Sequence, residues 1–388
     1  MDERLLSDIV SNLRPSKTIA MFNKAKTLEN TGKRILHLEL GEPDIPSPKS
    51  VKNALIQALE ENFTQYTMSS GIIELRKAIA SYYQRKYNIS HIDPNSEIVA
   101  LPGAKVGIFN AFMSLINPGD EVIIPTPAWP SYIGIAKLFG GKPILIPGGL
   151  DPEGYDIDLF EKAINEKTKL IVLNFPSNPT SRDLGGNLYK PLAEIVRKNP
   201  HVMVLSDEIY SELAYNGTAP SFLQCNDIKN QSIILNGFSK SHSMTGYRLG
   251  YLVAPKPLAT KISQIQGQST TCPASFVQKA GIAALNDENH VEYARKIYKD
   301  RSKMVLDLLK EIPQISASTP DAGFYVFPKI EGASDDFAMN LLEKQGVAVT
   351  AGSAFKAPDD SYLRLSFATG EEIIKEGIEK MKKQIKTL

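Results

Sequence analysis

The sequence has few of the features that mark secreted, membrane-spanning or nucleic-acid-binding proteins. Only two of its 388 residues are cysteines, Cys225 and Cys272, and they stand far apart without the spacing of a metal site. We therefore predict no metal centre and a reducing, cytoplasmic location. The 44 Lys and Arg residues are matched by 43 Asp and Glu residues, so no excess charge directs the chain to nucleic acid or to a membrane surface. No apolar run approaches the roughly 20 residues of a membrane-spanning helix.

Targeting and repetitive segments are also missing. The chain starts with MDERLLSDIV, which has early acids and no long apolar core, so we do not expect a secretory signal. We find neither internal repeats nor low-complexity segments. With 42% hydrophobic and 22% charged residues, the composition is that of an ordinary globular protein. Its length allows two domains, or one large lobe and a smaller one.

The stretch with the most distinctive chemistry covers residues 232–250 and reads SIILNGFSKSHSMTGYRLG. The apolar run Ile233–Leu235 predicts a buried strand, and Lys240 follows it after a turn of small residues. An amine close to a buried strand is desolvated, which lowers its pKa and makes it a usable nucleophile. Arg248 offers a planar set of donors suited to a phosphate. A lysine and an arginine in a loop are more often ordinary solvated cations. Evidence from the rest of the chain is therefore needed to distinguish a binding site from a surface loop.

Polar groups and glycines follow strand after strand between residues 97 and 240. In each case a short apolar run predicts the strand. Open α/β sheets bind ligands at the carboxyl ends of their strands, so we predict a single binding site there. The residues at these strand ends are Gly103 with Ala104 and Lys105, then Trp129, Asn178, Asp207 with Tyr210, and Ser239 with Lys240. Taken singly, several have a structural alternative: turn geometry for Gly103, core packing for Trp129 and a helix cap for Asp207.

Several of these segments resemble class I pyridoxal-phosphate-dependent aminotransferases, and among them the prokaryotic aspartate aminotransferase subgroup. The strongest match is GFSK at 237–240 followed by MTGYRLG at 244–250, which is similar to the family's lysine-attachment motif. GEPD at 41–44, NFPSNPT at 174–180 and DEIY at 207–210 resemble further family segments. The resemblance extends in motif order from Ser16 to Arg364. Ser181 stands where the family usually has glycine, so we expect that turn to differ slightly.

The resemblance implies that the chain binds pyridoxal 5'-phosphate. Lys240 would carry the Schiff base with the cofactor, and Arg248 would hold its phosphate. Asp207 would keep the pyridine nitrogen protonated, so that the ring acts as an electron sink. Asn178 and Tyr210 would bond to the 3-oxygen of the ring, on which Trp129 would stack. The other implied cofactor contacts are Gly103, Ala104, Lys105, Ser239 and, from the neighbouring subunit of a homodimer, Tyr66.

The resemblance also implies a ping-pong exchange between an L-amino acid and a 2-oxo acid, with Lys240 moving the substrate proton. Arg364 would bind the substrate α-carboxylate, beside the backbone of Gly41 and the side chain of Asn178. Lys105 would bind a side-chain carboxylate, with the cofactor phosphate or solvent as the alternative, and Ser16 resembles the loop that closes over the substrate. We expect aspartate or glutamate as donor. An aromatic or alanine aminotransferase, or a carbon–sulfur β-lyase of the same fold, is the alternative.

The fold that the resemblance implies is α/β and of fold type I, with a mostly parallel seven-stranded sheet, helices on both faces and a smaller α+β lobe from both termini. We assign residues 1–46 to an N-terminal arm and part of the small domain, 47–288 to the large cofactor-binding domain and 289–388 to the small C-terminal domain. A cofactor-sensing regulator would need a further DNA-binding module, for which the early motifs leave no room. A nicotinamide enzyme would need a glycine fingerprint after its first strand, which residues 102–105 do not supply.

Overall fold

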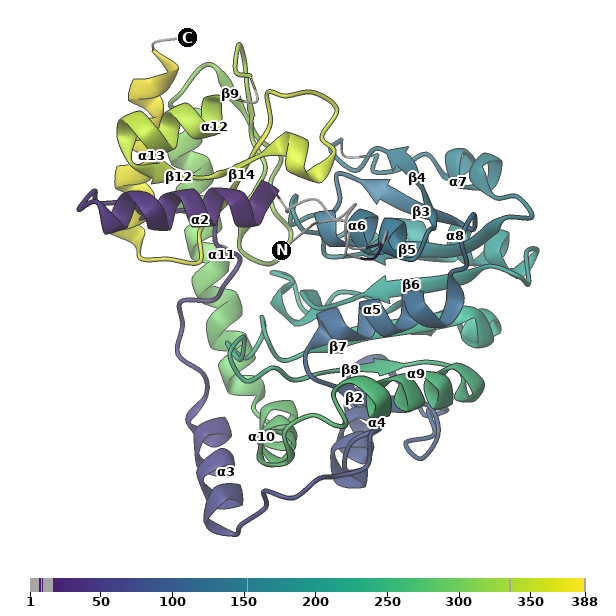
Figure 1. The fold of residues 1–388 in the computed structure, drawn as a ribbon. Helices are drawn as coiled ribbons and strands as arrows, with labels where there is room; N and C mark the ends of the chain where they lie inside the picture. The colour runs from purple at the N-terminus through teal and green to yellow at the C-terminus, as the bar shows by residue number, and fades with distance from the viewer. Residues whose placement is uncertain (1–6, 8, 10–16, 152, 335, 387–388) are drawn as a thin grey trace.

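A seven-stranded sheet forms the centre of the molecule (Figure 1). The structure, a computed structural model, describes residues 7, 9, 17–151, 153–334 and 336–386. β8 is antiparallel to its two neighbours β2 and β7, and the other pairs are parallel. This is the mostly parallel sheet that the sequence predicts. In spatial order the strands are β2 (Ile98–Leu101), β8 (Gly250–Val253), β7 (Ser232–Gly237), β6 (Met203–Asp207), β5 (Thr168–Asn174), β3 (Glu121–Thr126) and β4 (Lys142–Pro147).

Helices cover both faces of this sheet, which explains why its central strands are apolar along their whole length. Successive residues of a strand point to opposite faces. In β5, Ile171 and Leu173 join a core with α4, α8 and α10, while Leu170 and Val172 join a second core with α5, α6 and α9. The helices around the sheet are α3 (Lys49–Glu60), α4 (Ile73–Tyr87), α5 (Ala104–Leu115), α6 (Pro130–Leu138), α7 (Ile157–Ala163), α8 (Gly185–Arg197), α9 (Lys256–Ser269) and α10 (Ser275–Leu285).

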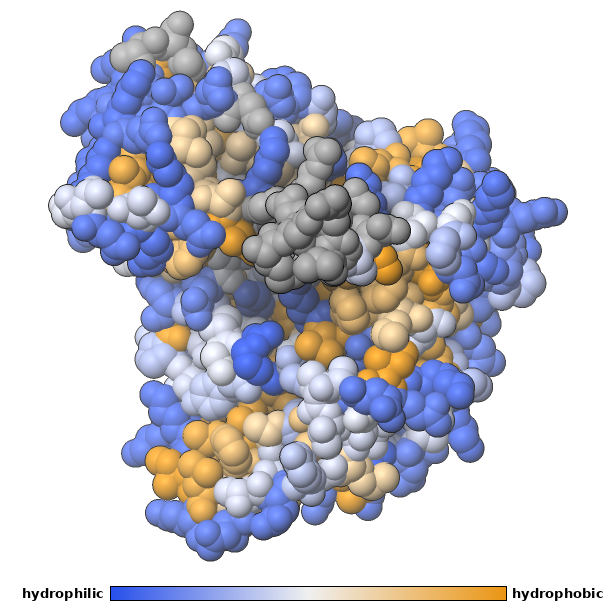
Figure 2. Space-filling view, in the orientation of Figure 1, coloured by the Kyte–Doolittle hydropathy of each residue, from blue (hydrophilic) through white to orange (hydrophobic). Residues whose placement is uncertain are grey.

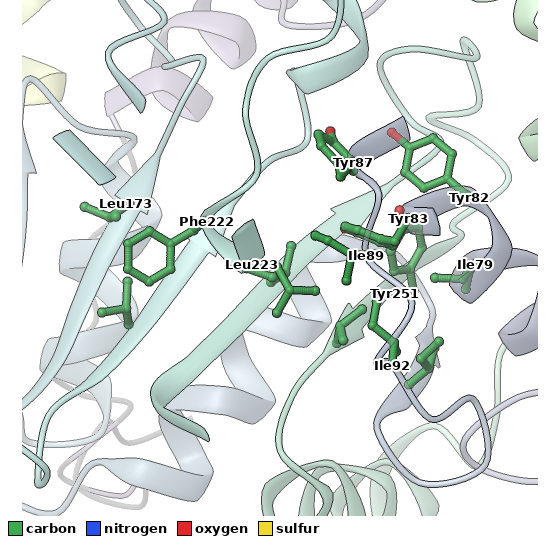
Figure 3. Packing of buried hydrophobic residues seen from close by; sticks show 14 of the residues in the cluster. Ile79, Tyr82, Tyr83, Tyr87, Ile89, Ile92, Leu173, Phe222, Leu223 and Tyr251 are labelled. Atoms are coloured by element: carbon green, nitrogen blue, oxygen red, sulfur yellow. The ribbon is translucent and has the colours of Figure 1, made fainter. Parts of the chain in front are cut away.

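A group of aromatic rings stiffens the first of these cores (Figure 3). Tyr82, Tyr83 and Tyr87 come from one helix, α4, and Tyr251 comes from β8. Tyr83 packs edge-on against Tyr82 at a centroid distance of 5.3 Å and against Tyr251 at 6.3 Å. Each such pair adds about 0.5–1.5 kcal/mol beyond the area that it buries. The edge of the sheet next to the lysine-bearing segment is therefore firmly held.

A smaller lobe is built from both ends of the chain, because β1 (Leu36–His37) pairs in parallel with β12 (Val347–Ala348). In Figure 1 the N-terminal helix α2 lies across the C-terminal elements of this lobe, and the long helix α11 connects it to the helices around the sheet. Its helices are α2 (Lys17–Asn30), α11 (Glu288–Lys310), α12 (Phe337–Asn340), the π-helical turn η5 (Leu341–Gln345) and α13 (Glu371–Ile385). Its other strands are β9 (Ile315–Ser316), β10 (Tyr325–Val326), β11 (Lys329–Ile330), β13 (Thr350–Ala351) and β14 (Leu363–Ser366). The domain boundaries at 46/47 and 288/289 stay predictions.

Short helical turns complete the architecture. The 3₁₀ turns are η2 (Ser211–Leu213), η3 (Phe222–Gln224), η4 (Asn226–Gln231) and η6 (Gly352–Phe355). Within the described ranges, no helix is both long and apolar enough to cross a membrane.

Candidate active site

A cavity of about 450 Å³ lies at the carboxyl ends of the sheet strands, against the smaller lobe. It gathers most of the residues that the sequence predicts for the site: Gly41, Ala104, Lys105, Trp129, Asn178, Asp207, Tyr210, Ser239, Lys240, Arg248 and Arg364. Gly103 lies directly behind Arg248. Two predicted residues are not gathered there. Tyr66 is 86% exposed on the surface of this chain, and Ser16 lies outside the described residues.

Lys240 follows β7 and is mostly buried. Its Nζ donates a hydrogen bond to the carbonyl oxygen of Gly41 at 2.5 Å. The pKa of the amine is lowered to about 8, mainly by burial; the charges of Arg364 and Arg248 contribute to this shift, and those of Glu42 and Asp207 oppose it. A substantial fraction of the amine is therefore neutral, and nucleophilic, near physiological pH.

Asp207 ends β6 and is buried. Its Oδ2 accepts a hydrogen bond from the hydroxyl of Tyr132 at 2.7 Å, and its Oδ1 accepts one from the backbone N–H of Ile209 at 3.2 Å. Burial raises the pKa of Asp207 to about 6. Tyr132 belongs to α6 and did not enter our sequence-based site. The sequence signal that could have indicated Tyr132 is its position one helical turn after Trp129, at the exit of a predicted strand.

Three features favour an anion at one end of the cavity. The first N–H groups of α5 have no partner within the helix, and Gly103, which caps it, has no side chain to bind them. Gly103 has a φ of +94°, and a Cβ atom there would lie 2.4 Å from Nη2 of Arg248. Lys105 lies with its Nζ 4.9 Å from the centre of the Trp129 ring, and partial burial together with the charge of Arg248 lowers its pKa. Two cations and a helix start thus share this end.

Arg364 lies at another wall of the cavity, 4% exposed. Its Nη1 donates to Oδ1 of Asn178 at 3.1 Å, and its Nη2 donates to the backbone carbonyl of Glu39. Both acceptors are neutral amide oxygens, so they leave the positive charge of the guanidinium uncompensated. The guanidinium carbon sits 4.6 Å from the centre of the Tyr325 ring. That ring is fixed in turn by a 3.2 Å hydrogen bond between its hydroxyl and that of Tyr210.

Comparison with known proteins identifies the family. The family model described as aminotransferase class I and II matches residues 33–381. The chain belongs to the class I and II aminotransferases. It is 37% identical to an aspartate aminotransferase of Bacillus subtilis, over 97% of this chain and 98% of that protein.

Solved structures of aminotransferases share the fold. An aspartate aminotransferase from Thermus thermophilus with maleate has a TM-score of 0.90 at 32% identity, over 98% of this chain and 99% of that one. An aromatic aminotransferase from Pyrococcus horikoshii has a TM-score of 0.86 at 33% identity, over 94% and 99% of the two chains. These matches confirm the predicted family, the type I fold and the aminotransferase activity.

The described part of this aminotransferase contains no cluster of His, Cys, Asp and Glu residues that could hold a metal ion. The 450 Å³ cavity brings together the predicted Lys240 amine, the predicted Asp207 carboxylate and the predicted cations Lys105, Arg248 and Arg364, and it is also lined by Glu39 and Glu42, which the sequence did not indicate.

Proposed function

We propose that this aminotransferase holds pyridoxal 5'-phosphate in the 450 Å³ cavity and transfers the amino group of aspartate or glutamate to a 2-oxo acid. One observation carries the proposal: a mostly buried lysine amine, with its pKa lowered to about 8, lines the same cavity as Arg248 and Arg364, and both charges act on it. Two separate cationic groups in one cavity suit two separate anionic groups, a phosphate and a carboxylate.

The residues present fit the cofactor. Arg248, Ser239 and the start of α5 supply donors for a phosphate. The space behind Arg248 depends on glycine, because a side chain at Gly103 would displace the guanidinium. Asp207 supplies a buried anion for a ring nitrogen. When bound, the cofactor supplies an aldehyde for exchange with amines and a conjugated ring that withdraws electrons from the substrate.

The further cofactor contacts that we propose come from three side chains of the same cavity. Tyr210 and Asn178 offer polar groups for a ring oxygen, and Trp129 offers an aromatic face. Tyr210 is buried, and its hydroxyl is oriented by Tyr325. The backbone amide of Asn178 donates to Oδ1 of Asn174 at 2.9 Å, and the side chain of Asn174 donates to the carbonyl of Asp207 at 3.0 Å. These bonds join the ends of β5 and β6 and support a rigid ring site.

The chain's own groups divide the work of amino transfer. The neutral Lys240 amine would accept the proton of the substrate α-carbon and hold it for return, since it is an amine of lowered pKa that lines the cavity. The Asp207 carboxylate, with a pKa of about 6, is mostly ionised at pH 7.5 and above. Arg364 binds the α-carboxylate and so fixes the orientation of the bond that breaks. The carbonyl of Gly41, which accepts from Lys240, helps to hold the amine in place.

The side-chain specificity rests on Lys105. Its ammonium group lies on the cavity wall, where it could bind a second carboxylate, and the relative from Thermus thermophilus is described with maleate, a dicarboxylate. The alternative is that Lys105 binds the cofactor phosphate, because the charge of Arg248, the proposed phosphate ligand, acts on Lys105. An aromatic substrate is the second candidate, because α2 lines the cavity with Ile19 and Phe22. The family match supports amino transfer over the carbon–sulfur lyase alternative.

We also propose that the enzyme is a cytoplasmic homodimer in which Tyr66 completes the site of the neighbouring subunit. Large apolar side chains are exposed on α3, on α5 and two residues after Tyr66, namely Ile56 at 52%, Met113 at 52% and Met68 at 67%. Figure 2 shows apolar surface over α3, toward the lower left. Exposed apolar area of this kind is typical of an interface.

The experiment that tests the cofactor assignment is reductive trapping with borohydride followed by peptide mass spectrometry. The wild type should carry one pyridoxyl group, on Lys240, and Lys240→Ala should carry none. A pyridoxyl group on another lysine of the wild type would overturn the assignment. Substrate class is tested by the spectral half-reaction with a panel of amino acids, in which aspartate and glutamate should react fastest.

A further inference from the structure

Glu39 touches the candidate active site in two ways. Its backbone carbonyl accepts a hydrogen bond from Nη2 of Arg364. Its side chain carries a carboxylate that is almost fully buried, since the residue is 4% exposed and lines the cavity. The residue whose backbone accepts from Arg364 therefore also carries a buried carboxylate that lines the same cavity. A guanidinium and a carboxylate in a buried site attract each other strongly and form paired hydrogen bonds.

That ion pair is not formed. Within the described residues, Oε2 of Glu39 and Nε of Arg364 are both buried and both without a hydrogen-bond partner. Oε1 of Glu39 instead bonds to Nδ1 of His37 at 2.8 Å. His37 ends β1, and Glu39 stands two residues later at a bend, where this hydrogen bond holds the two side chains together.

His37 is held from both ends. Its Nε2 bonds to Oε1 of Glu29 at 3.0 Å, and Glu29 in turn pairs with Lys26 at 2.8 Å. Glu29 and Lys26 belong to α2, the helix whose first turns cover the cavity. The hydrogen bond that His37 makes to the Glu39 carboxylate is the largest cause that raises the pKa of His37, and Glu29 adds to it. A protonated imidazole donates from both nitrogens, which suits a position between two carboxylates.

We propose that His37 is a positioning residue that keeps the Glu39 carboxylate turned away from Arg364, so that the guanidinium stays available to the carboxylate of the substrate. The inference rests on the proposed role of Arg364. Without His37, Glu39 would compete with every substrate for Arg364. Amino acid and 2-oxo acid both carry that carboxylate, so binding of both would weaken together.

The test compares His37→Phe, Glu39→Gln and the double variant, each as the cofactor-loaded enzyme. His37→Phe should raise the KM of both substrates by about tenfold or more, with kcat changed by less than about threefold. Adding Glu39→Gln should return both KM values to within about threefold of the wild type, because a neutral amide cannot compete for the guanidinium charge. The matched control is Glu29→Gln, which keeps the bond between His37 and Glu39 and should change KM much less.

Two results would overturn the proposal. In one, His37→Phe leaves both KM values unchanged. In the other, it raises them and Glu39→Gln does not reverse the rise, which is the result expected of a merely structural histidine. If His37→Phe does not fold, His37→Gln is judged by the same reversal. Arg364→Lys separates this inference from the proposed function: an unchanged KM in that variant would remove the role of Arg364, whereas a raised KM leaves only the role of His37 in question.

Discussion

The pKa of the Lys240 amine can be measured through the rate at which the cofactor-free protein captures pyridoxal 5'-phosphate. Only the neutral amine attacks an aldehyde, so the rate follows the neutral fraction. With a pKa of about 8, roughly one amine in ten is neutral at pH 7, against about one in three thousand for an ordinary lysine with a pKa of 10.5. The burial of Lys240 therefore accounts for about a 300-fold faster capture at neutral pH.

The assay is stopped-flow absorbance of the bound cofactor between pH 6 and 10. The rate should rise about tenfold per pH unit and level off near pH 8. Glu42→Gln supplies a matched control, because the Glu42 carboxylate raises the pKa of Lys240 and its removal should move the midpoint to lower pH. A rate that keeps rising to pH 10 in the wild type would refute the desolvation argument. So would a midpoint that Glu42→Gln moves to higher pH.

Three further predictions follow from the structure. Lys105→Ala should lower kcat/KM for aspartate by a factor that corresponds to about 1.5–3 kcal/mol of lost transition-state stabilisation, and leave kcat/KM for alanine nearly unchanged. An equal loss for both substrates would assign Lys105 to the cofactor. Tyr66→Phe should be impaired, and mixing it with Lys240→Ala should partly restore activity through hybrid dimers; failure of impaired subunits to complement would place Tyr66 in its own subunit's site. Burial raises the pKa of Glu208 to about 8, above the 4.5 of an unperturbed carboxyl, so its contribution to stability is full below pH 4.5 and is lost as pH rises through 8. Glu208→Gln, which mimics the neutral acid, should therefore gain unfolding free energy relative to the wild type between pH 5 and 9, as measured by urea unfolding; a constant difference would contradict this.

Most of the site was predictable because its residues stand at strand ends. Asp207 and Lys240 each follow an apolar run in the sequence, and parallel strands bring their carboxyl ends to one edge of the sheet. The sequence also predicts a helix over residues 18–28, and the structure has α2 over Lys17–Asn30. The pattern did not indicate that this helix would cover the cavity, because helical periodicity shows which face is apolar but not what it faces.

Contacts between distant segments were not predictable from local patterns. Tyr132 bonds to Asp207, which is 75 residues further along the chain, and neither residue's neighbours indicate that contact. The alternating apolar residues of 35–40 predict a strand over that whole segment, but in the structure the strand is limited to Leu36–His37. The backbone carbonyl of Glu39, beyond the strand, instead accepts from Arg364. Such a contact depends on how the smaller lobe closes on the sheet.

The sequence by itself determined the family, the sheet with its covering helices, and which residues stand at the strand ends. The family and its sheet follow from the resemblance of the motifs to a known family, and the strand ends follow from apolar periodicity and turn glycines. These are local signals, which do not require the rest of the chain to be in place. The tertiary structure alone decided the chemistry of those residues. The lowered pKa of Lys240, the neutral partners of Arg364 and the engagement of Glu39 by His37 arise from desolvation and from charges on separate segments. Desolvation and charge interactions both depend on which groups are close in space, not on which residues are neighbours in the sequence.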